Sequence, residues 1–141
     1  MSGFLLDTNI VSELIKPQPE IKLAKWIETT DEALLFLSVL TLGEIRKGIA
    51  SHHDPRRRAK LEAWLVGDLQ VRFAGRVLLI DAAIAERWGR LAAEGDNQGR
   101  PLPVIDGLLV ATAQHHDLTF VTRNTADLPR TGVSLFNPWC D

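Results

Sequence analysis

The sequence is poor in cysteine, and Cys140 is its only one, so no disulfide can form within the chain. Disulfides belong to oxidising compartments, and their absence favours the reducing cytoplasm. No apolar run approaches the roughly 20 residues of a membrane-spanning helix, since Phe4-Leu5-Leu6 ends at Asp7. This start also lacks the basic segment and long apolar core of a signal peptide. The sequence therefore predicts a cytoplasmic protein without a membrane span.

An excess of positive charge is also missing. The 141 residues include 16 Lys and Arg against 18 Asp and Glu, a net charge of −2 with histidine neutral. Because phosphate binding depends on Lys and Arg, this balance argues against generic nucleic-acid binding. Residues 46–60 nevertheless hold six basic residues and one acid, a local charge of +5. The six are Arg46, Lys47, Arg56, Arg57, Arg58 and Lys60.

This basic stretch has two interpretations, a solvated helix start or a surface for an anionic partner. Asp54-Pro55 is typical of a helix start, with an N-cap residue followed by proline. Three arginines would then occupy the first turn, where the helix dipole disfavours cations. A sequence that tolerates this cost favours the partner interpretation.

Short apolar runs alternate with segments of helical periodicity. The runs are mostly continuous, as in parallel strands covered on both faces, and they predict strands at 3–6, 34–39, 77–80, 118–122 and 133–136. Helices are expected after the break at 17–19, after Asp54-Pro55, from Asp81 to about Gly95, and from Pro103 to about His116. The last is apolar on nearly all sides, which predicts a buried helix.

These alternating elements predict an α/β fold. The chain is expected to form one domain over residues 1–141, with a central, mainly parallel β-sheet flanked by helices on both faces.

Acidic side chains recur beyond the predicted strands, where ligands bind in open α/β sheets. Asp7 ends the first strand, Glu44 lies beyond the second, and Asp106 stands in the first turn of the buried helix. Asn124 follows the fourth strand, and Asp127 comes three residues later. Structural alternatives are a helix cap at Asp7, a solvated Glu44 and a dipole-complementing Asp106.

Asp106 is the hardest of these acids to explain structurally, because it stands in the most apolar helix of the chain. A buried carboxylate is costly unless it is paired or coordinates a metal, and few bases lie near it in sequence. Oxygen-only ligands favour Mg²⁺ or Mn²⁺. Clustered carboxylates with such a metal beside a basic stretch predict phosphodiester hydrolysis by metal-activated water. Converging acids also repel one another, which raises their pKa values without the metal.

Four segments, in this order, carry a resemblance to a known family: residues 5–9 (LLDTN), 38–44 (SVLTLGE), 106–113 (DGLLVATA) and 121–124 (VTRN). The chain resembles a PIN domain over its whole length. More narrowly, it resembles the VapC toxins of bacterial type II toxin–antitoxin pairs, especially the FitB-like branch, whose terminus is similar to residues 136–139 (FNPW). The resemblance implies a parallel sheet between helices and Mg²⁺- or Mn²⁺-dependent endoribonuclease activity that leaves 5′-phosphate and 3′-hydroxyl ends.

On this resemblance, Asp7, Glu44 and Asp106 match the family's catalytic, metal-binding acids. The fourth position departs from the branch, because Asn124 stands where FitB-like members can have Asp, whereas many VapC toxins have Asn there and an acid at the position of Asp127. Asn124 could ligate through its carbonyl oxygen, but it brings no charge. Hydrogen bonds that orient the ligands are expected from Thr8, Asn9, Ser38 and Thr122. RNA contacts are expected from Arg46, Lys47, Arg56, Arg57, Arg58 and Arg123, although Arg123 could also be an ordinary surface arginine.

The resemblance also implies partners. A VapB-like antitoxin would lay a C-terminal segment over the acidic groove, with an arginine directed at the carboxylates, and the toxin would form a homodimer within a toxin–antitoxin hetero-oligomer. Two alternatives stay open. One is a receiver-like phosphoacceptor domain that uses Asp81, which follows a predicted strand, although the chain lacks an acidic pair after the first strand. The other is a non-catalytic binding module with the PIN fold.

Overall fold

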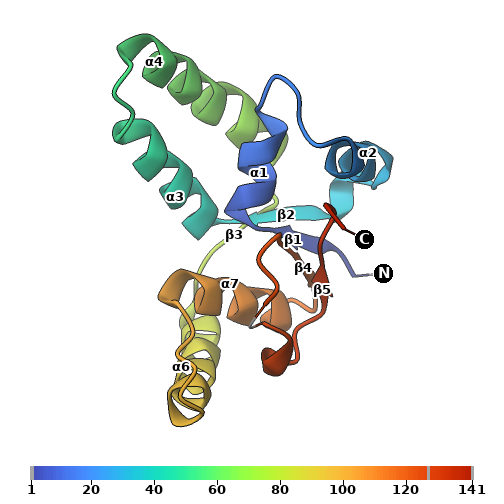
Figure 1. Ribbon diagram of the computed structural model, residues 1–141, viewed down its shortest axis with the longest axis vertical. Helices are drawn as coiled ribbons and strands as arrows, with labels where there is room; N and C mark the ends of the chain where they lie inside the picture. Colours follow the sequence, from blue (N-terminus) through green and yellow to red (C-terminus); the bar gives the residue numbers. More distant parts are fainter. Residues whose placement is uncertain (1, 127, 141) are drawn as a thin grey trace.

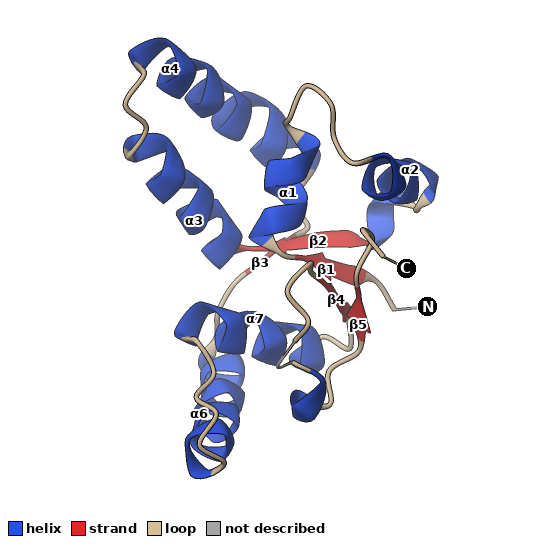
Figure 2. Cartoon of the chain, viewed as in Figure 1, coloured by secondary structure: helices blue, strands red, loops and turns tan. Residues whose placement is uncertain are grey.

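The computed structural model describes residues 2–126 and 128–140, in which five strands form one parallel sheet. The strands are β1 (Phe4–Leu6), β2 (Leu35–Ser38), β3 (Val77–Leu78), β4 (Thr119–Val121) and β5 (Leu135–Phe136). Their order is β3-β2-β1-β4-β5, and every neighbouring pair is parallel (Figure 2). The predicted fold class is confirmed. The strands are shorter than predicted, because only residues in register with a neighbouring strand join the ladder.

Helices cover both faces of this sheet (Figure 1). On one side lie α1 (Thr8–Leu14), α2 (Ile21–Thr29), α3 (Val39–Ala50) and α4 (Pro55–Ala63). On the other side lie α6 (Ala82–Asn97) and α7 (Val104–His115). The connections include the 3₁₀ turns η1 (Glu32–Leu34) and η3 (Pro129–Thr131). Helix α4 continues through η2 (Trp64–Leu69) into the short α5 (Gln70–Arg72), and the sequence pattern did not predict that η2 is π-helical.

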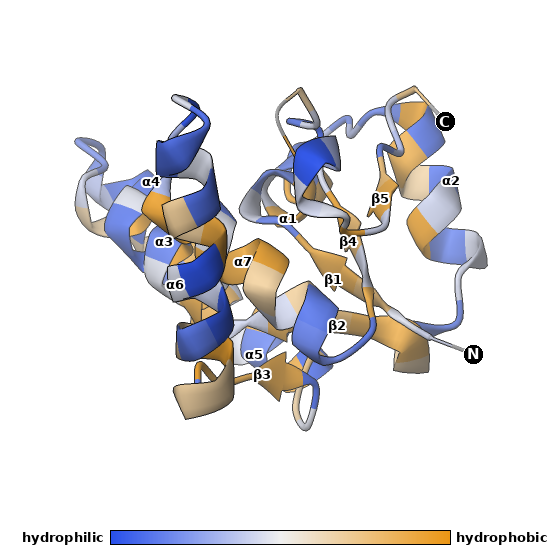
Figure 3. Ribbon diagram, turned by 90° about the horizontal axis from the view of Figure 1, so that it is seen from below, coloured by the Kyte–Doolittle hydropathy of each residue, from blue (hydrophilic) through white to orange (hydrophobic). Residues whose placement is uncertain are grey.

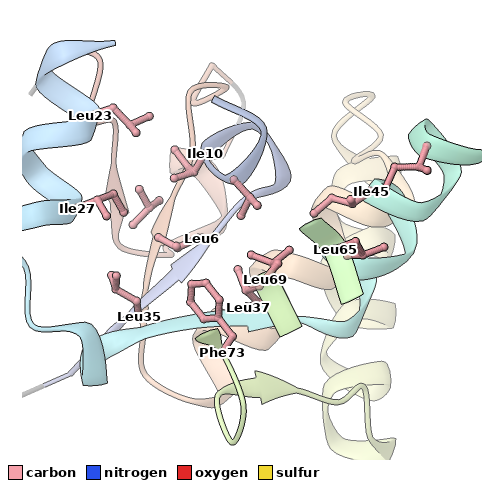
Figure 4. Close-up of a cluster of buried hydrophobic side chains, with 13 residues drawn as sticks. Leu6, Ile10, Leu23, Ile27, Leu35, Leu37, Ile45, Leu65, Leu69 and Phe73 are labelled. Carbon is pink, nitrogen blue, oxygen red and sulfur yellow. The ribbon is translucent and has the colours of Figure 1, made fainter. Parts of the chain in front are cut away.

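Each face of the sheet packs against its own hydrophobic core, because successive side chains on a strand point to opposite faces. Leu6 of β1 packs with Ile10 and Leu23 in the core under α1 and α2 (Figure 4). Its neighbour Leu5 packs with Leu109 in the core under α7. Burial on both faces explains why the strands are mostly hydrophobic along their length (Figure 3).

The predicted helix starts at Asp54 and Asp81 are confirmed. Asp54 caps α4 and Asp81 caps α6, each by accepting a hydrogen bond from a backbone N–H of the first turn. The expectation that Gly95 ends α6 is wrong, because the helix continues to Asn97 and the chain turns at Gly99, whose φ is +69°. Gly95 is instead buried within the helix, where an added Cβ would lie 2.8 Å from the carbonyl oxygen of Arg100. Among the described residues, no helix is both long and apolar enough to cross a membrane.

Candidate active site

Three acidic residues lie near the carboxyl ends of the central strands. Asp7 directly follows β1, Glu44 lies on the helix that follows β2, and Asp106 lies in the first turn of α7. Burial raises the pKa of Asp7, and the charges of Asp106 and Glu44 raise it further. Burial likewise raises the pKa of Asp106, with a contribution from Glu44. The charges of Glu44 and Asp106 thus act on Asp7, and the charge of Glu44 acts on Asp106.

Asp7 is the most enclosed of the three, with 8% of its surface exposed. Its Oδ1 accepts a hydrogen bond from the backbone N–H of Thr8 at 2.7 Å, which caps α1. Its Oδ2 accepts a hydrogen bond from the hydroxyl of Thr122 at 2.7 Å. These two bonds lower the pKa of Asp7, but desolvation outweighs them. The helix-cap interpretation and the site interpretation of Asp7 are thus compatible, because each uses a different oxygen.

Glu44 is held by Thr8, which also lies next to Thr41. The hydroxyl of Thr8 donates a short hydrogen bond to Oε1 of Glu44 and lies 3.4 Å from the hydroxyl of Thr41. Thr41 is fully buried, and sequence reasoning did not identify it. It stands three residues before Glu44 on α3, and this helical spacing could have indicated it.

The other predicted orienting residues have different surroundings. The hydroxyl of Ser38 is fully buried and accepts a hydrogen bond from the N–H of Leu40, so it caps α3. The buried Oδ1 of Asn9 has no hydrogen-bond partner among the described residues. Of the four predicted residues, the structure thus brings Thr8 and Thr122 into direct contact with the acids.

The fourth position of the site lies just after β4. Asn124 is exposed, and its backbone N–H donates to the hydroxyl of Thr122 at 3.2 Å. Since Thr122 also bonds Asp7, this contact fixes the loop beside the acids. Asp127 lies outside the described residues.

Most of the predicted RNA-binding residues lie on α3 and α4. Arg46 and Lys47 are on α3, and Arg56, Arg57 and Arg58 are on α4, the two helices that project from the sheet together (Figure 1). Arg46 forms an ion pair with Glu62 at 3.1 Å. The guanidinium of Arg58 donates to the carbonyl oxygen of His52 at 2.8 Å. By contrast, Arg123 directly follows Thr122 and therefore lies beside the site.

A groove between α1, α3 and α4 leads away from the acids. A hollow of about 170 Å³ is lined by Thr8 and Glu44 at one end and by apolar residues beyond them, among them Trp64. An adjacent hollow of about 300 Å³ shares Trp64 and adds the cations Arg57 and Lys60. The groove is therefore acidic at one end, apolar in the middle and basic at the other end.

The donor set fits a hard divalent cation, because it consists of carboxylate oxygens whose mutual repulsion a cation would relieve. No Lys, Arg or His of the described residues forms an ion pair with Asp7, Glu44 or Asp106. As the side chains stand, no group of three His, Cys, Asp or Glu within residues 2–126 and 128–140 is placed to hold a metal ion. The carboxylate of Glu44 is directed to Thr8 instead.

Comparisons with known proteins agree on one family. The model of the PIN domain family matches residues 4–133. The toxin FitB of Neisseria gonorrhoeae is 33% identical over 137 residues, which cover 97% of this chain and 99% of FitB. The VapC ribonuclease Y4jK of Sinorhizobium fredii is 33% identical over 135 residues, 96% of each chain. The crystal structure of FitAcB from Neisseria gonorrhoeae superposes with a TM-score of 0.92 at 32% identity, covering 98% of this chain and 99% of that one.

Proposed function

The chain belongs to the PIN domain family, and from this premise we propose that it is a toxin-type endoribonuclease that cleaves RNA phosphodiester bonds. The observation that carries the proposal is the position of Asp7, Glu44 and Asp106 beyond the ends of the central strands, where no Lys, Arg or His of the described residues forms an ion pair with them. The similarity to the toxin FitB and to a VapC ribonuclease supports both the toxin role and the ribonuclease chemistry.

The three acids would hold Mg²⁺ or Mn²⁺, with Asn124 as an uncharged fourth ligand. Such an ion would polarise a phosphoryl oxygen and lower the pKa of an attacking water. Asp7 brings a preorganised carboxylate, because Thr8 and Thr122 each hold one of its oxygens. Glu44 would exchange its bond with Thr8 for the ion, and Thr8 would then be free to orient the ligand.

The acids also explain how an acidic protein can accept RNA. Without a cation, three carboxylates at one site repel a phosphodiester, whereas each bound divalent ion adds two positive charges there. The exposed cations of α3 and α4 would then extend the favourable field along the substrate. A homodimer would bring two such basic surfaces together.

We further propose that a VapB-like antitoxin neutralises the chain by occupying the groove between α1, α3 and α4. The apolar middle of the groove, with Trp64, fits the apolar side of a peptide segment. At the acidic end, an arginine of the antitoxin would bind Glu44 and its neighbours in place of the metal. At the other end, Arg57 and Lys60 would meet acidic residues of the same segment.

The receiver-like alternative is not supported by the sheet. Receiver-like domains have the strand order 2-1-3-4-5, whereas this sheet has the order 3-2-1-4-5. Asp81 lies beyond the edge strand β3, where its carboxylate accepts a hydrogen bond from the N–H of Ile84 and caps α6. The second alternative, a non-catalytic PIN module, shares the fold and is separated by experiment.

The decisive experiment incubates the purified chain, free of antitoxin, with total RNA in Mg²⁺ or in EDTA. We expect cleavage in Mg²⁺, none in EDTA, and none from Asp7→Asn or Asp106→Asn. Asp81→Asn is the matched control, because asparagine also caps helices, and it should cleave like the parent chain. Metal-independent cleavage, or full activity in both site variants, would contradict the mechanism. A well-folded chain that binds RNA without cutting it would favour the non-catalytic module.

A further inference from the structure

A second depression, of about 590 Å³, is lined by residues that do not line the groove. Its walls come from the end of α1, the loop that leads to α2, and two residues of the C-terminal third of the chain, Arg123 and Trp139. Both cations and carboxylates line it, together with Ile21, which is 79% exposed. Nothing in the proposed catalytic chemistry uses this depression.

Strand pairing brings Arg123 and Trp139 together. The parallel neighbours β4 and β5 end at the same edge of the sheet, and the N–H of Thr122 donates to the carbonyl oxygen of Phe136 at 3.0 Å. Beyond this point Asn137 joins the two segments. Its Nδ2 lies 3.4 Å from the carbonyl oxygen of Arg123, and its Oδ1 accepts from the N–H of Trp139 at 2.9 Å. The guanidinium of Arg123 lies over the indole of Trp139, 4.9 Å from the ring centroid.

In this stacked position Arg123 can still donate hydrogen bonds from its guanidinium. A guanidinium that rests its face on an aromatic ring keeps its N–H groups in the plane, where they can donate to a phosphate. No carboxylate of the described residues lies within ion-pair distance of Arg123, although its charge acts on Glu13 and helps to lower the pKa of that carboxylate. Its chain neighbour Thr122 bonds Asp7, so a phosphate on Arg123 would lie close to the candidate metal ligands.

The floor of the depression is preformed. Glu13 of α1 is only 8% exposed, and its carboxylate accepts from Nζ of Lys16 at 2.8 Å and from the N–H of Glu20 at 3.0 Å. These bonds hold the pKa of Glu13 below its ordinary value. An ionised Glu13 thus ties the loop between α1 and α2 to the end of α1, and Gln18 of the loop and Ile21, the first residue of α2, line the depression.

We propose that this depression is a subsite for one nucleotide of a single-stranded RNA, next to the phosphodiester that is cut. Arg123 would bind the phosphate of this nucleotide, and its base would enter the depression that Trp139 and Ile21 line, beside the stacked guanidinium. Unstacked bases bind to aromatic and guanidinium planes in this way. The inference rests on the proposed endoribonuclease function. A peptide partner is better matched by the apolar groove between α1, α3 and α4, where Trp64 lies.

The test measures RNA binding by Asp106→Asn protein, in which the RNA stays intact, using the anisotropy of labelled homopolymers of about ten nucleotides. We expect Arg123→Ala to weaken binding about tenfold. The slope of the logarithm of the binding constant against the logarithm of salt concentration should fall by about 1, as expected for the loss of one phosphate contact. Arg123→Lys should recover the salt dependence but only part of the affinity, since lysine lacks the planar fork. Arg90→Ala is the matched control, because Arg90 is an exposed arginine of α6 that pairs with Glu86, and it should bind like the parent protein.

The base is tested with oligonucleotides that carry one abasic residue at successive positions. In the parent protein, an abasic residue at one position should weaken binding several-fold. The Trp139→Ala variant should bind the oligonucleotide with that abasic residue and the intact oligonucleotide equally. Trp139→Phe, which keeps an aromatic ring, should restore the difference and guards against a folding defect in Trp139→Ala.

Equal binding by the Arg123→Ala and Arg90→Ala variants, or an abasic profile unchanged in Trp139→Ala, would overturn the subsite. Loss of antitoxin binding, with RNA binding intact, would assign the depression to a peptide instead. If the wild-type chain cuts RNA in Mg²⁺ but the results expected for the Arg123 and Trp139 variants are not obtained, only the subsite proposal is wrong. If the wild-type chain neither cuts nor binds RNA, the proposed function fails and the subsite with it.

Discussion

The hydroxyl of Thr122 donates a hydrogen bond to Oδ2 of Asp7 at 2.7 Å, although the two residues are 115 positions apart in the sequence. Both are buried, Thr122 completely. The bond connects the ends of the neighbouring strands β1 and β4, whose register pairs Leu6 with Val121. One side chain of the fourth strand therefore determines how a candidate metal ligand of the first strand is held.

Replacing Thr122 with valine is expected to lower the free energy of unfolding by about 1–3 kcal/mol, because it leaves a buried carboxylate oxygen without its partner. It should also raise the pKa of Asp7 further, since this hydrogen bond lowers it, and reduce metal affinity or activity by about 10- to 100-fold. Urea unfolding and the pH–rate profile of RNA cleavage measure these effects. Thr122→Ser keeps the hydroxyl and should stay near the wild type; equal losses in both variants would contradict a role for the hydrogen bond.

Asp106→Asn is expected to stabilise the metal-free chain at neutral pH while it abolishes cleavage. Burial and Glu44 raise the pKa of Asp106 above its ordinary value of 3.8, so its ionisation destabilises the folded state. The stability contributed by the protonated group is fully present below about pH 4 and is lost as pH rises through the raised pKa. The advantage of the variant should therefore appear only as pH rises above this window. Urea unfolding of both proteins in EDTA, from about pH 4 to neutral pH, measures the difference in their free energies of unfolding. A stability advantage of Asp106→Asn that grows toward low pH would contradict this prediction.

Metal binding should stabilise the folded wild-type chain. A ligand that binds only the folded state at about 100 times its Kd adds about 2.7 kcal/mol to the free energy of unfolding. We expect Mg²⁺ or Mn²⁺ to raise the unfolding temperature of the wild type and EDTA to reverse the increase. Asp7→Asn and Asp106→Asn should show little increase, whereas Asp81→Asn should respond like the wild type. An equal increase in all four proteins would indicate metal binding elsewhere.

Gly107→Ala is expected to destabilise the fold by about 1–3 kcal/mol, because it overpacks the contact between α6 and α7. A Cβ at Gly107 would lie 2.9 Å from Cδ1 of Trp88 and 3.2 Å from Cδ2 of Leu102. Gly89→Ala is the control on α6, where nothing lies within 4 Å of the added Cβ, and it should gain about 0.5–1 kcal/mol. Thermal and urea unfolding distinguish the two, and equal stability of both variants would contradict the close packing.

Much of the fold was predictable from local patterns. Continuous apolar runs predicted the strands, since a strand buried on both faces needs no alternation. The caps at Asp54 and Asp81 were predicted because capping uses a side chain and a backbone N–H within the same turn. The prediction that Gly95 ends α6 was wrong because the role of this glycine depends on packing rather than on its neighbours in sequence. This glycine fits a close approach by the carbonyl oxygen of Arg100, and local sequence does not distinguish such a packing role from a helix end.

By itself, the sequence determined the α/β class and the caps at Asp54 and Asp81, because each depends on residues close together in the chain. Only the tertiary structure decided that Asp7, Glu44 and Asp106 share one electrostatic environment and that Thr122 holds Asp7. It also decided that Arg123 lies on Trp139 rather than with the basic residues of α3 and α4. The physical reason is strand order and register: parallel pairing of β1 with β4, and of β4 with β5, brings distant segments to one edge of the sheet.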